Sequence, residues 1–324
     1  MSKLIRVGIN GFGRIGRCLT RIIKARDNLE LVKINASGSL EQNLHLLKYD
    51  SIHGRFEGEL TGVEWSHTRD IDDIEWPDVD VVLECTGVFN DEQSYIHLGN
   101  GAKSVLISSP AKNVDRTVVY GVNHKDLSVK DRVISNASCT TNCLAPIAKV
   151  LNNHLSIISG SMTTIHSYTG DQRAIDKRHK DMYRSRAASI SMIPTTTGAA
   201  KSLSLVIPEL EGKLIGSAIR VPTPNVSCVD LTIYCERVVD KELINHVVLE
   251  ASEHDMKGII GYETAPLVSV DFNTTTESCI LAADSTIVTG QLVRVLCWFD
   301  NEWAFSCRMA DMASYIGGLN EIHN

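Results

Sequence analysis

The sequence contains no long apolar run, and no window is apolar for long enough to span a bilayer. Its first residues, Met-Ser-Lys-Leu-Ile-Arg, also lack the long apolar segment of a signal peptide. Positive charge is not in excess either, since 32 Lys and Arg against 39 Asp and Glu give a net charge of −7. We therefore expect neither a nucleic-acid partner nor binding to an anionic membrane surface.

The nine cysteines lack the paired spacing of a small disulfide-rich domain, which indicates free thiols in a reducing cytoplasm. Cys139 and Cys143 stand four residues apart in a predicted helix and could form half of a metal site. No second Cys/His pair at zinc spacing accompanies them, so we expect no metal. Internal repeats and low-complexity linkers are missing too. A chain of 324 residues is long enough for two domains, each with its own core.

The N-terminal part of the chain alternates short apolar strands with helices. We expect strands at Ile5–Asn10, Leu31–Ala36 and Val79–Thr86, and helices at Ile15–Ala25 and Leu40–Tyr49. Short, continuous apolar strands separated by helices are typical of a parallel sheet covered on both faces. The sequence therefore predicts an α/β fold that begins with a Rossmann-type, doubly wound parallel sheet.

The pattern changes near Ser138, where longer strands with more alternation begin. After a helix at Thr140–Asn152, only two further convincing helices interrupt these strands, which favours an α+β domain with a mostly antiparallel sheet. We expect a dinucleotide-binding domain at 1–138 and 302–324, and a catalytic domain at 139–301. The later elements are predicted at Ile157–Ser167, Thr197–Val206, Leu214–Val221, Cys228–Glu236, Lys241–Met256, Ser278–Ala283, Leu292–Phe299 and, as a last helix packed on the first domain, Trp303–Ile316.

A glycine-rich loop follows the first predicted strand and opens the first helix. It reads Gly11-Phe-Gly13-Arg-Ile-Gly16, with the strand–turn–helix context that a dinucleotide-binding loop requires. The glycines permit a tight turn and a close approach of the backbone to a pyrophosphate, which the helix N-terminus stabilises. The alternative is a turn that only shapes the backbone and binds no ligand, and we favour dinucleotide binding.

The end of the second predicted strand bears on which dinucleotide is bound. NAD sites usually place an acidic residue there, to hold the ribose 2′-hydroxyl. This chain has Asn35, Ala36 and Ser37 instead, so no carboxylate would repel the 2′-phosphate of NADP. The alternative is tolerance of either cofactor, with weakened binding of NAD.

Residues 136 to 146 read Asn-Ala-Ser-Cys-Thr-Thr-Asn-Cys-Leu-Ala-Pro, which places Cys139 where a loop meets a helix. A thiol at a helix N-terminus meets unpaired backbone N–H groups and the positive end of the helix dipole. Both favour the nucleophilic thiolate. A lone cysteine is more often a buried structural thiol, and the rest of the sequence decides between the two.

With its glycine loop and Cys139 segment taken together, the chain resembles a phosphorylating glyceraldehyde-3-phosphate dehydrogenase, and the similarity runs nearly end to end. The resemblance implies a Rossmann domain followed by a catalytic domain, with the last helix returning to the first. It is carried by His45–Ser51, Ser135–Asn142, Thr164–Thr169, Ile193–Lys201, Arg220–Asn225 and Trp298–Trp303.

The resemblance implies covalent catalysis. Cys139 would attack the aldehyde carbon of glyceraldehyde 3-phosphate, and His166 would keep the thiol ionised and take the hydroxyl proton as hydride leaves for the nicotinamide. Inorganic phosphate would then attack the thioester, and the backbone N–H of Cys139 would stabilise the oxyanion. A single histidine on a strand is more often structural, but the matching segment favours catalysis.

The resemblance also implies which residues bind the substrates and the cofactor, NADP or NAD. Hydroxyls, arginines and a helix N-terminus all suit phosphate. Arg184 could alternatively belong to a solvated charged surface. The implied phosphate-binding residues are Thr169, Asp171, Arg184 and Arg220 for one pocket, and Ser138, Thr140, Thr197 and Gly198 for the other. The implied cofactor-binding residues are Gly11, Gly13, Arg14, Ile15, Gly16, Asn35, Ala36, Ser37, Arg69, Thr86, Gly87, Ser108, Lys177, Arg178 and Asn301, which would hold the nicotinamide carboxamide.

The chain departs from the family pattern in a way that bears on the cofactor. Ala36 stands where NAD-using members carry an acid, and Lys177 and Arg178 stand where NAD-specific members usually show Leu-Pro. In the family this loop reaches the adenosine end of the cofactor in a neighbouring subunit of a homotetramer. We therefore expect a preference for NADP, the alternative being that both cations are solvated and both cofactors are accepted.

Two other departures are expected to leave the chemistry intact. Phe305 stands where a tyrosine usually lies near the nicotinamide, and the segment between Gly54 and Asp78 is shorter than usual. The rival functions are an erythrose-4-phosphate dehydrogenase, which would hydrolyse its thioester, a non-catalytic binding protein on the same fold, and a cysteine hydrolase or acyltransferase without redox chemistry.

Overall fold

The computed structural model describes residues 4–322 of the chain. The predicted first domain also included residues 1–3 and 323–324, which lie outside the described residues. The chain forms two compact units, one of residues up to Ser138 together with those from Ser306 onward, the other of Cys139–Phe305. The domain boundaries expected from the sequence stay a prediction.

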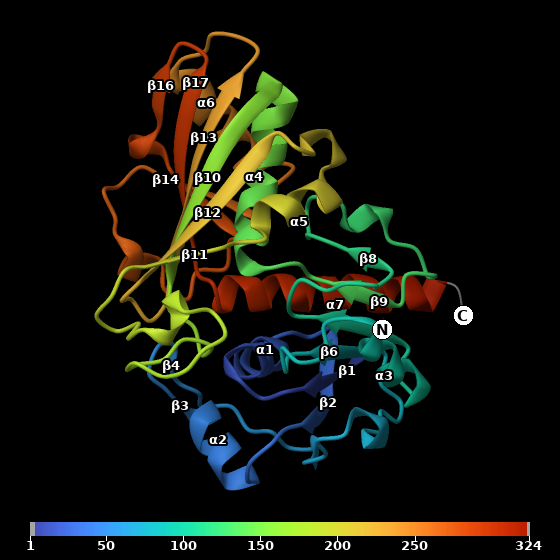
Figure 1. The fold of residues 1–324 in the computed structure, drawn as a ribbon. Coiled ribbons are helices and arrows are strands. Elements are labelled where there is room, and N and C mark those ends of the chain that lie inside the picture. The colour runs from blue at the N-terminus through green and yellow to red at the C-terminus, as the bar shows by residue number, and fades with distance from the viewer. Residues whose placement is uncertain (1–3, 323–324) are drawn as a thin grey trace. The chain divides into compact units, whose positions relative to one another are not determined.

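The first unit is built on a seven-stranded sheet in the order β5-β2-β1-β6-β7-β9-β8, and every pairing in it is parallel. The predicted Rossmann-type parallel sheet is confirmed (Figure 1). Its order reverses at β1, whose neighbours are β2 and β6, and ligands of such sheets bind at this switch point. Its strands are β1 Ile5–Asn10, β2 Leu29–Asn35, β5 Glu64–Ser66, β6 Val81–Glu84, β7 Ser104–Ile107, β8 Arg116–Thr117 and β9 Val133–Ser135.

The helices of this unit follow the strands as the apolar periodicity predicts, with small differences at their ends. They are α1 Arg14–Lys24, α2 Leu40–Lys48 and the short α3 Ile96–Gly99, and a two-stranded ribbon of β3 Tyr49–Asp50 and β4 Gly54–Arg55 follows α2. Helix α2 begins at a capping box in which Ser39 and Gln42 bond each other's backbone.

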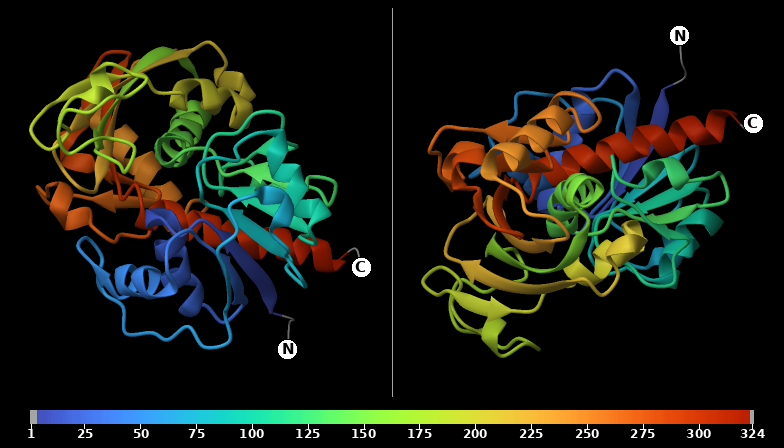
Figure 2. Two further views of the ribbon diagram at one scale, coloured as in Figure 1. Left: turned by 60° about the horizontal axis from the view of Figure 1, so that its bottom comes forward. Right: turned by 90° about the horizontal axis from the view of Figure 1, so that it is seen from above.

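The last helix, α7 Trp303–Ile322, is longer than the predicted helix, and from Ser306 it belongs to the first unit. Figure 2 shows α7 (red) against the strands of that unit, where Asn320 donates to the Ser104 hydroxyl at 3.1 Å. Arg26 pairs with Asp311 at 2.7 Å. Among the described residues, no helix is both long and apolar enough to cross a membrane.

The second unit is built on an eight-stranded sheet in the order β11-β12-β10-β13-β17-β15-β14, with β16 paired to β17. Only β10–β12 and β14–β15 are parallel pairs, so the predicted mostly antiparallel sheet is confirmed. The strands are β10 Ile157–Ser167, β11 Ile193–Thr195, β12 Leu214–Val221, β13 Ser227–Cys235, β14 Ile260–Glu263, β15 Cys279–Ala282, β16 Ile287–Thr289 and β17 Leu292–Phe299.

Three helices accompany this sheet: α4 Cys139–Leu155, α5 Ala199–Val206 and α6 Lys241–Glu253. Helix α4 packs against α5, α6 and the strands β13, β15 and β17, and nearly all of its side chains in the middle turns are buried. It begins at Cys139, one residue before the predicted start. This places the cysteine in the first turn of a helix that the core holds rigidly.

Candidate functional site

The structure brings Cys139 and His166 together in the second unit. Cys139 opens α4, and His166 is the next-to-last residue of β10, which runs beside α4. The Cys139 Sγ and the His166 Nε2 are 3.4 Å apart. Strand β10 pairs in parallel with β12 so that His166 lies opposite Arg220. A thiol, an imidazole and a guanidinium thus meet at the ends of three elements.

The hydrogen bonds around His166 determine which ring nitrogen carries the proton. Nδ1 lies 2.7 Å from the carbonyl oxygen of Ser167, and Arg220 Nη1 lies 2.9 Å from the same oxygen. Arg220 Nη1, which only donates, also lies 3.0 Å from Nδ1, but the contact to the carbonyl oxygen, which only accepts, is shorter and favours a proton on Nδ1. The lone pair of Nε2 then faces the sulfur of Cys139 and is positioned to accept its proton.

Burial shifts the pKa of both reactive groups toward their neutral forms. Burial lowers the pKa of His166 to about 3, with a further contribution from the positive charge of Arg220. Burial also raises the pKa of the Cys139 thiol, although Arg220 and hydrogen bonds from Thr140 act to lower it. Desolvation therefore opposes the ionisation that the helix N-terminus and the nearby cation favour, and the expected thiolate stays a prediction.

An arginine-rich group lies beside this pair. Arg184 Nη1 donates to Asp171 at 3.0 Å, and its Nε donates to the Thr195 hydroxyl at 3.0 Å. The charges of Arg184 and Asp171 act on Arg220, whose own pKa is lowered chiefly by burial. The structure thus gathers Asp171, Arg184 and Arg220, and Thr169 follows β10 two residues before Asp171. This arrangement is suited to an anion.

The residues expected at a second anion pocket lie at the starts of two helices. Ser138 and Thr140 flank Cys139, and Thr140 bonds the cysteine sulfur through both its backbone and its hydroxyl. Gly198 is the N-cap of α5, and the Thr197 hydroxyl accepts from the Ala199 N–H at 3.2 Å. Helix N-termini and hydroxyls provide donors for an oxyanion or a phosphate.

Asn301 lies between β17 and α7 and is 5% exposed. Its Oδ1 accepts from the Ser167 hydroxyl at 2.9 Å and from the Ser227 hydroxyl at 2.9 Å. Sequence reasoning singled out neither serine as a functional residue. The only available signal was that each stands at the end of a strand, which is too weak to predict contacts across the sheet.

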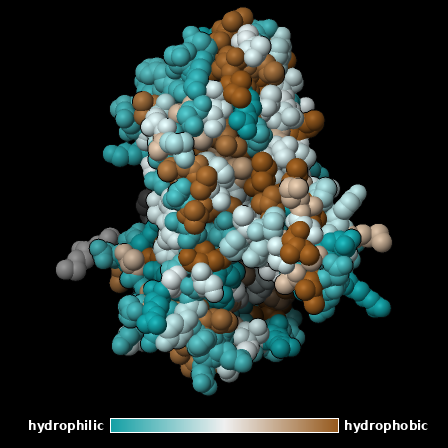
Figure 3. Space-filling model, turned by 90° about the vertical axis from the view of Figure 1, so that its left-hand side faces the viewer, coloured by the Kyte–Doolittle hydropathy of each residue, from teal (hydrophilic) through white to brown (hydrophobic). Residues whose placement is uncertain are grey.

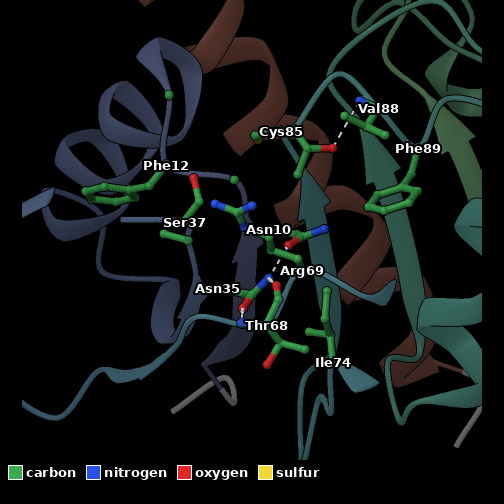
Figure 4. Close-up of a pocket in the computed structure, with 14 residues that line it drawn as sticks. Asn10, Phe12, Asn35, Ser37, Thr68, Arg69, Ile74, Cys85, Val88 and Phe89 are labelled. Atoms are coloured by element: carbon green, nitrogen blue, oxygen red, sulfur yellow. Dashed lines mark hydrogen bonds between the residues drawn. The ribbon is translucent and has the colours of Figure 1, made fainter. Parts of the chain in front are cut away.

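The first unit contains a cavity of about 430 Å³ beside the glycine loop, at the switch point of its sheet (Figure 4). Seven of the expected cofactor residues line it: Gly11, Gly13, Asn35, Ala36, Ser37, Arg69 and Thr86. The lining residues that the sequence did not single out are Asn10, Phe12, Thr68, Ile74, Cys85, Val88 and Phe89. The expected residues outside this lining are Arg14, Ile15, Gly16, Gly87 and Ser108 of the first unit and Lys177, Arg178 and Asn301 of the second.

Two glycines of the loop are required by close approaches of the backbone, and the third leaves open space. Gly11 has φ +95°, and a Cβ there would lie 2.7 Å from the backbone of Cys85. A Cβ on Gly16 would lie 2.2 Å from the carbonyl oxygen of Gly11. A Cβ on Gly13 would meet no protein atom within 4 Å, so its space is open to a ligand. A loop of this kind fits the pyrophosphate of a dinucleotide.

Buried polar groups form the floor of the cavity. Asn35 donates to Asn10 at 2.8 Å, and Asn10 donates to Glu84 at 2.6 Å. The other carboxylate oxygen of Glu84 accepts from the Thr86 N–H at 2.7 Å and fixes the turn after β6. The signal that could have found Asn10 and Glu84 is a polar residue at the last position of an otherwise apolar strand.

The side chain of Arg14 points to Asp50, with Nη2 donating to Oδ1 at 3.1 Å. Burial alone would raise the pKa of Asp50, but the hydrogen bonds from Arg14 and from the N–H groups of His53 and Ile52 outweigh it and lower that pKa. Arg14 thus links the start of α1 to Asp50 of β3, and the role expected of it belongs to its backbone.

Lys177 and Arg178 are exposed in the loop that follows β10, and the Lys177 N–H donates to the Ser185 carbonyl at 2.9 Å. They belong to the second unit, whereas the cavity beside Ala36 belongs to the first. Their expected contact with a neighbouring subunit's cofactor stays a prediction.

Two family models match the chain. Residues 5–92 match "Glyceraldehyde 3-phosphate dehydrogenase, NAD binding domain", and residues 138–301 match "Glyceraldehyde 3-phosphate dehydrogenase, C-terminal domain". The chain is 51% identical to a glyceraldehyde-3-phosphate dehydrogenase of Cereibacter sphaeroides, over 97% of this chain and 99% of the relative. It is 50% identical to that of Xanthobacter flavus over 97% and 99%, and 51% identical to that of Zymomonas mobilis over 96% and 98%.

Proposed function

The chain belongs to the glyceraldehyde 3-phosphate dehydrogenase family, and on this premise we propose that it oxidises D-glyceraldehyde 3-phosphate to 1,3-bisphosphoglycerate with inorganic phosphate and NAD(P). The observation that carries the proposal is the 3.4 Å approach of the Cys139 sulfur to the His166 Nε2, next to Arg220. A nucleophile, a base and a cation then stand within reach of one aldehyde group.

Because burial favours the neutral forms of Cys139 and His166, we infer an order of proton transfers that begins from a thiol. As the Cys139 sulfur attacks the aldehyde carbon, its proton passes to His166 Nε2 and then to the new oxyanion, giving a thiohemiacetal and a neutral histidine. His166 next takes the hydroxyl proton while hydride leaves the carbon, and a thioester remains on Cys139. The nicotinamide cofactor supplies the hydride acceptor. His166 releases its proton readily because its pKa is about 3.

Phosphate binding follows from the charges around the pair. Asp171, Arg184 and Arg220, with the Thr169 hydroxyl, would bind one phosphate group through forked donors. Ser138, Thr140, Thr197 and Gly198 would bind the other at two helix N-termini. The phosphate in this second site attacks the thioester carbon, the C–S bond breaks, and the sulfur of Cys139 leaves with the proton that His166 had taken, which releases the acyl phosphate. An erythrose-4-phosphate dehydrogenase would release the acid to water instead.

For the cofactor we propose NADP in preference to NAD. The cavity that Ala36 lines has no carboxylate among its lining residues, and Arg69 lines the same cavity. A guanidinium beside an alanine and Ser37 favours a 2′-phosphate over a free ribose hydroxyl. Lys177 and Arg178 of a neighbouring subunit would add positive charge at the same end of the cofactor.

The test is the rate of nicotinamide reduction with glyceraldehyde 3-phosphate, with and without phosphate, for NADP and for NAD. We expect a rate that depends on phosphate and a higher kcat/KM for NADP. Cys139→Ser should lower kcat by at least about a thousandfold. Turnover within a few-fold of the parent in both Cys139→Ser and His166→Asn would overturn the mechanism, and an equal rate without phosphate would favour the erythrose-4-phosphate reading.

The cofactor proposal has its own variants. Arg69→Ala should raise KM for NADP by about tenfold and leave that for NAD nearly unchanged, since it removes one charged hydrogen bond. Arg55→Ala, an exposed arginine outside the cavity lining, is the matched control. A higher kcat/KM for NAD in the parent enzyme would contradict the NADP preference and leave the reaction itself untouched.

A further inference from the structure

The side-chain amide of Asn301 is enclosed by two serines that the proposed mechanism does not use. Ser167 ends β10 and Ser227 begins β13, the neighbouring antiparallel strand, and both side chains are fully buried. Each hydroxyl oxygen lies 2.9 Å from Asn301 Oδ1. The Ser227 oxygen also accepts from the Ser167 N–H at 3.1 Å. The three side chains form one closed polar cluster in the second unit.

Counting protons in this cluster decides the orientation of the amide. With Asn301 Oδ1 facing the serines, both hydroxyl protons have an acceptor, and the two lone pairs of Oδ1 are used. If the amide were turned over, its NH₂ would donate to both hydroxyl oxygens. Ser227 could then donate only to Ser167, 3.4 Å away, and the Ser167 proton would be buried without an acceptor.

The saturated oxygen leaves the amide nitrogen as the only end of Asn301 that can serve a ligand. Within residues 4–322 Asn301 Nδ2 makes no hydrogen bond. This nitrogen is not among the buried polar atoms without a partner, so it reaches the surface of its unit and is free to meet an acceptor from outside the cluster.

We propose that Ser167 and Ser227 are positioning residues that present Asn301 as a donor to the carbonyl oxygen of the nicotinamide carboxamide. This inference rests on the proposed function, in which Asn301 contacts that group. The enzyme then recognises the carbonyl of the carboxamide through Asn301 and gains nothing there from its NH₂ group.

Ser167 connects this polar cluster to Cys139 and His166. Its carbonyl oxygen accepts from His166 Nδ1 at 2.7 Å and from Arg220 at 2.9 Å, while its hydroxyl donates to Asn301. One residue at the end of β10 therefore orients the base, the anion-binding arginine and the amide. Ser227 bonds Asn301 and the Ser167 N–H but neither His166 nor Arg220, so its substitution removes no direct hydrogen bond to the base or the arginine.

The experiment compares the dissociation constants of the oxidised cofactor and of its 3-acetylpyridine analogue, measured by fluorescence titration without substrate. The analogue keeps the carbonyl and replaces the NH₂ by a methyl group. We expect the parent enzyme to bind both within about threefold, because only the carbonyl is recognised. In Ser227→Ala, and more in Ser167→Ala/Ser227→Ala, Asn301 Oδ1 loses its donors and takes one from the carboxamide NH₂.

In the double variant, the dissociation constant of the analogue divided by that of the oxidised cofactor should therefore rise by about fivefold or more. Ser252→Ala on α6, whose hydroxyl bonds only the Leu249 carbonyl at 2.7 Å, is the matched control and should leave the ratio unchanged. If the double variant does not fold, Ser227→Ala alone carries the test.

The outcomes separate this inference from the function on which it rests. A parent enzyme that binds the analogue more than about tenfold more weakly would mean that the NH₂ is recognised, and would overturn the inference. An unchanged ratio in folded Ser227→Ala and in the double variant would do the same. A parent enzyme that binds neither dinucleotide would instead refute the proposed function.

Discussion

The reactive pair is governed by burial at the scale of single residues. His166 is 3% exposed and packs edge-on against Phe299, with ring centroids 5.9 Å apart. The same desolvation raises the pKa of the Cys139 thiol and opposes the effect of the nearby Arg220. Burial thus favours the proton on sulfur, and a thiol is less prone than a thiolate to oxidation.

The lowered pKa of His166 makes stability depend on pH. Between its ordinary value near 6.5 and its folded value of about 3, the unfolded chain binds a proton that the folded chain refuses. The free energy of unfolding should therefore fall as pH falls through this window, by up to about 1.4 kcal/mol per pH unit from this one group. His166→Gln should show a shallower slope in urea unfolding between about pH 6 and 4.

His246→Gln, on the exposed face of α6, is the control for that slope. A slope in His166→Gln as steep as that of the parent would show that burial of this imidazole does not set its protonation.

The glycine loop shows how element packing and ligand binding make different demands on similar residues. Gly16 is needed because α1 starts against the Gly11 carbonyl, which is backbone and cannot give way. Gly13, the N-cap of α1, has ordinary φ of −73° and open space where a side chain would stand. The fold therefore requires Gly16, and we infer that ligand binding requires Gly13.

These two glycines give a paired prediction. Gly16→Ala should lower the free energy of unfolding by about 1–3 kcal/mol, because helix and strand must move apart. Gly13→Ala should change it by less than about 1 kcal/mol while weakening cofactor binding, because its methyl group meets the pyrophosphate. Denaturant unfolding and cofactor titration of both variants decide the matter, and equal stability of Gly16→Ala and the parent would refute the packing argument.

At the scale of the whole molecule, hydrophobic side chains reach the surface in number. Figure 3 shows brown, hydrophobic residues interrupting the hydrophilic surface on one face. In the loop after β10, Ile175, Met182, Ile190 and Met192 are 75–85% exposed. Large exposed apolar groups in one segment mark an interface, and the sequence expectation of a homotetramer would cover them.

Light scattering behind a sizing column should therefore give a mass about four times the 35.6 kDa of the chain. Met182→Asp/Ile190→Asp should shift the protein to smaller species with unchanged circular dichroism, because an interface cannot bury unpaired charges. The same variant should lose part of its preference for NADP if Lys177 and Arg178 act across that interface. A monomeric mass for the parent protein would contradict the assembly and this route to cofactor selectivity.

Sequence alone was sufficient where the deciding interactions are local. The predicted and observed bounds agree in full for four strands, because long alternating or continuous apolar runs are compatible with only one type of secondary structure. These strands are Ile5–Asn10, Ile157–Ser167, Leu214–Val221 and Leu292–Phe299. The start of the Cys139 helix and the glycine loop were predicted for the same reason. The strands β5, β7, β8 and β9 were not, since two to four residues carry no periodicity.

The tertiary structure decided what depends on register and burial. The parallel register of β10 and β12 brings His166 to Arg220, and the sheet brings Ser227 to Asn301, 74 residues along the chain. Neither contact has a local signature. The pKa shifts of Cys139 and His166 were likewise beyond the sequence, because a helix N-terminus can be predicted from local residues whereas desolvation depends on everything packed around the group.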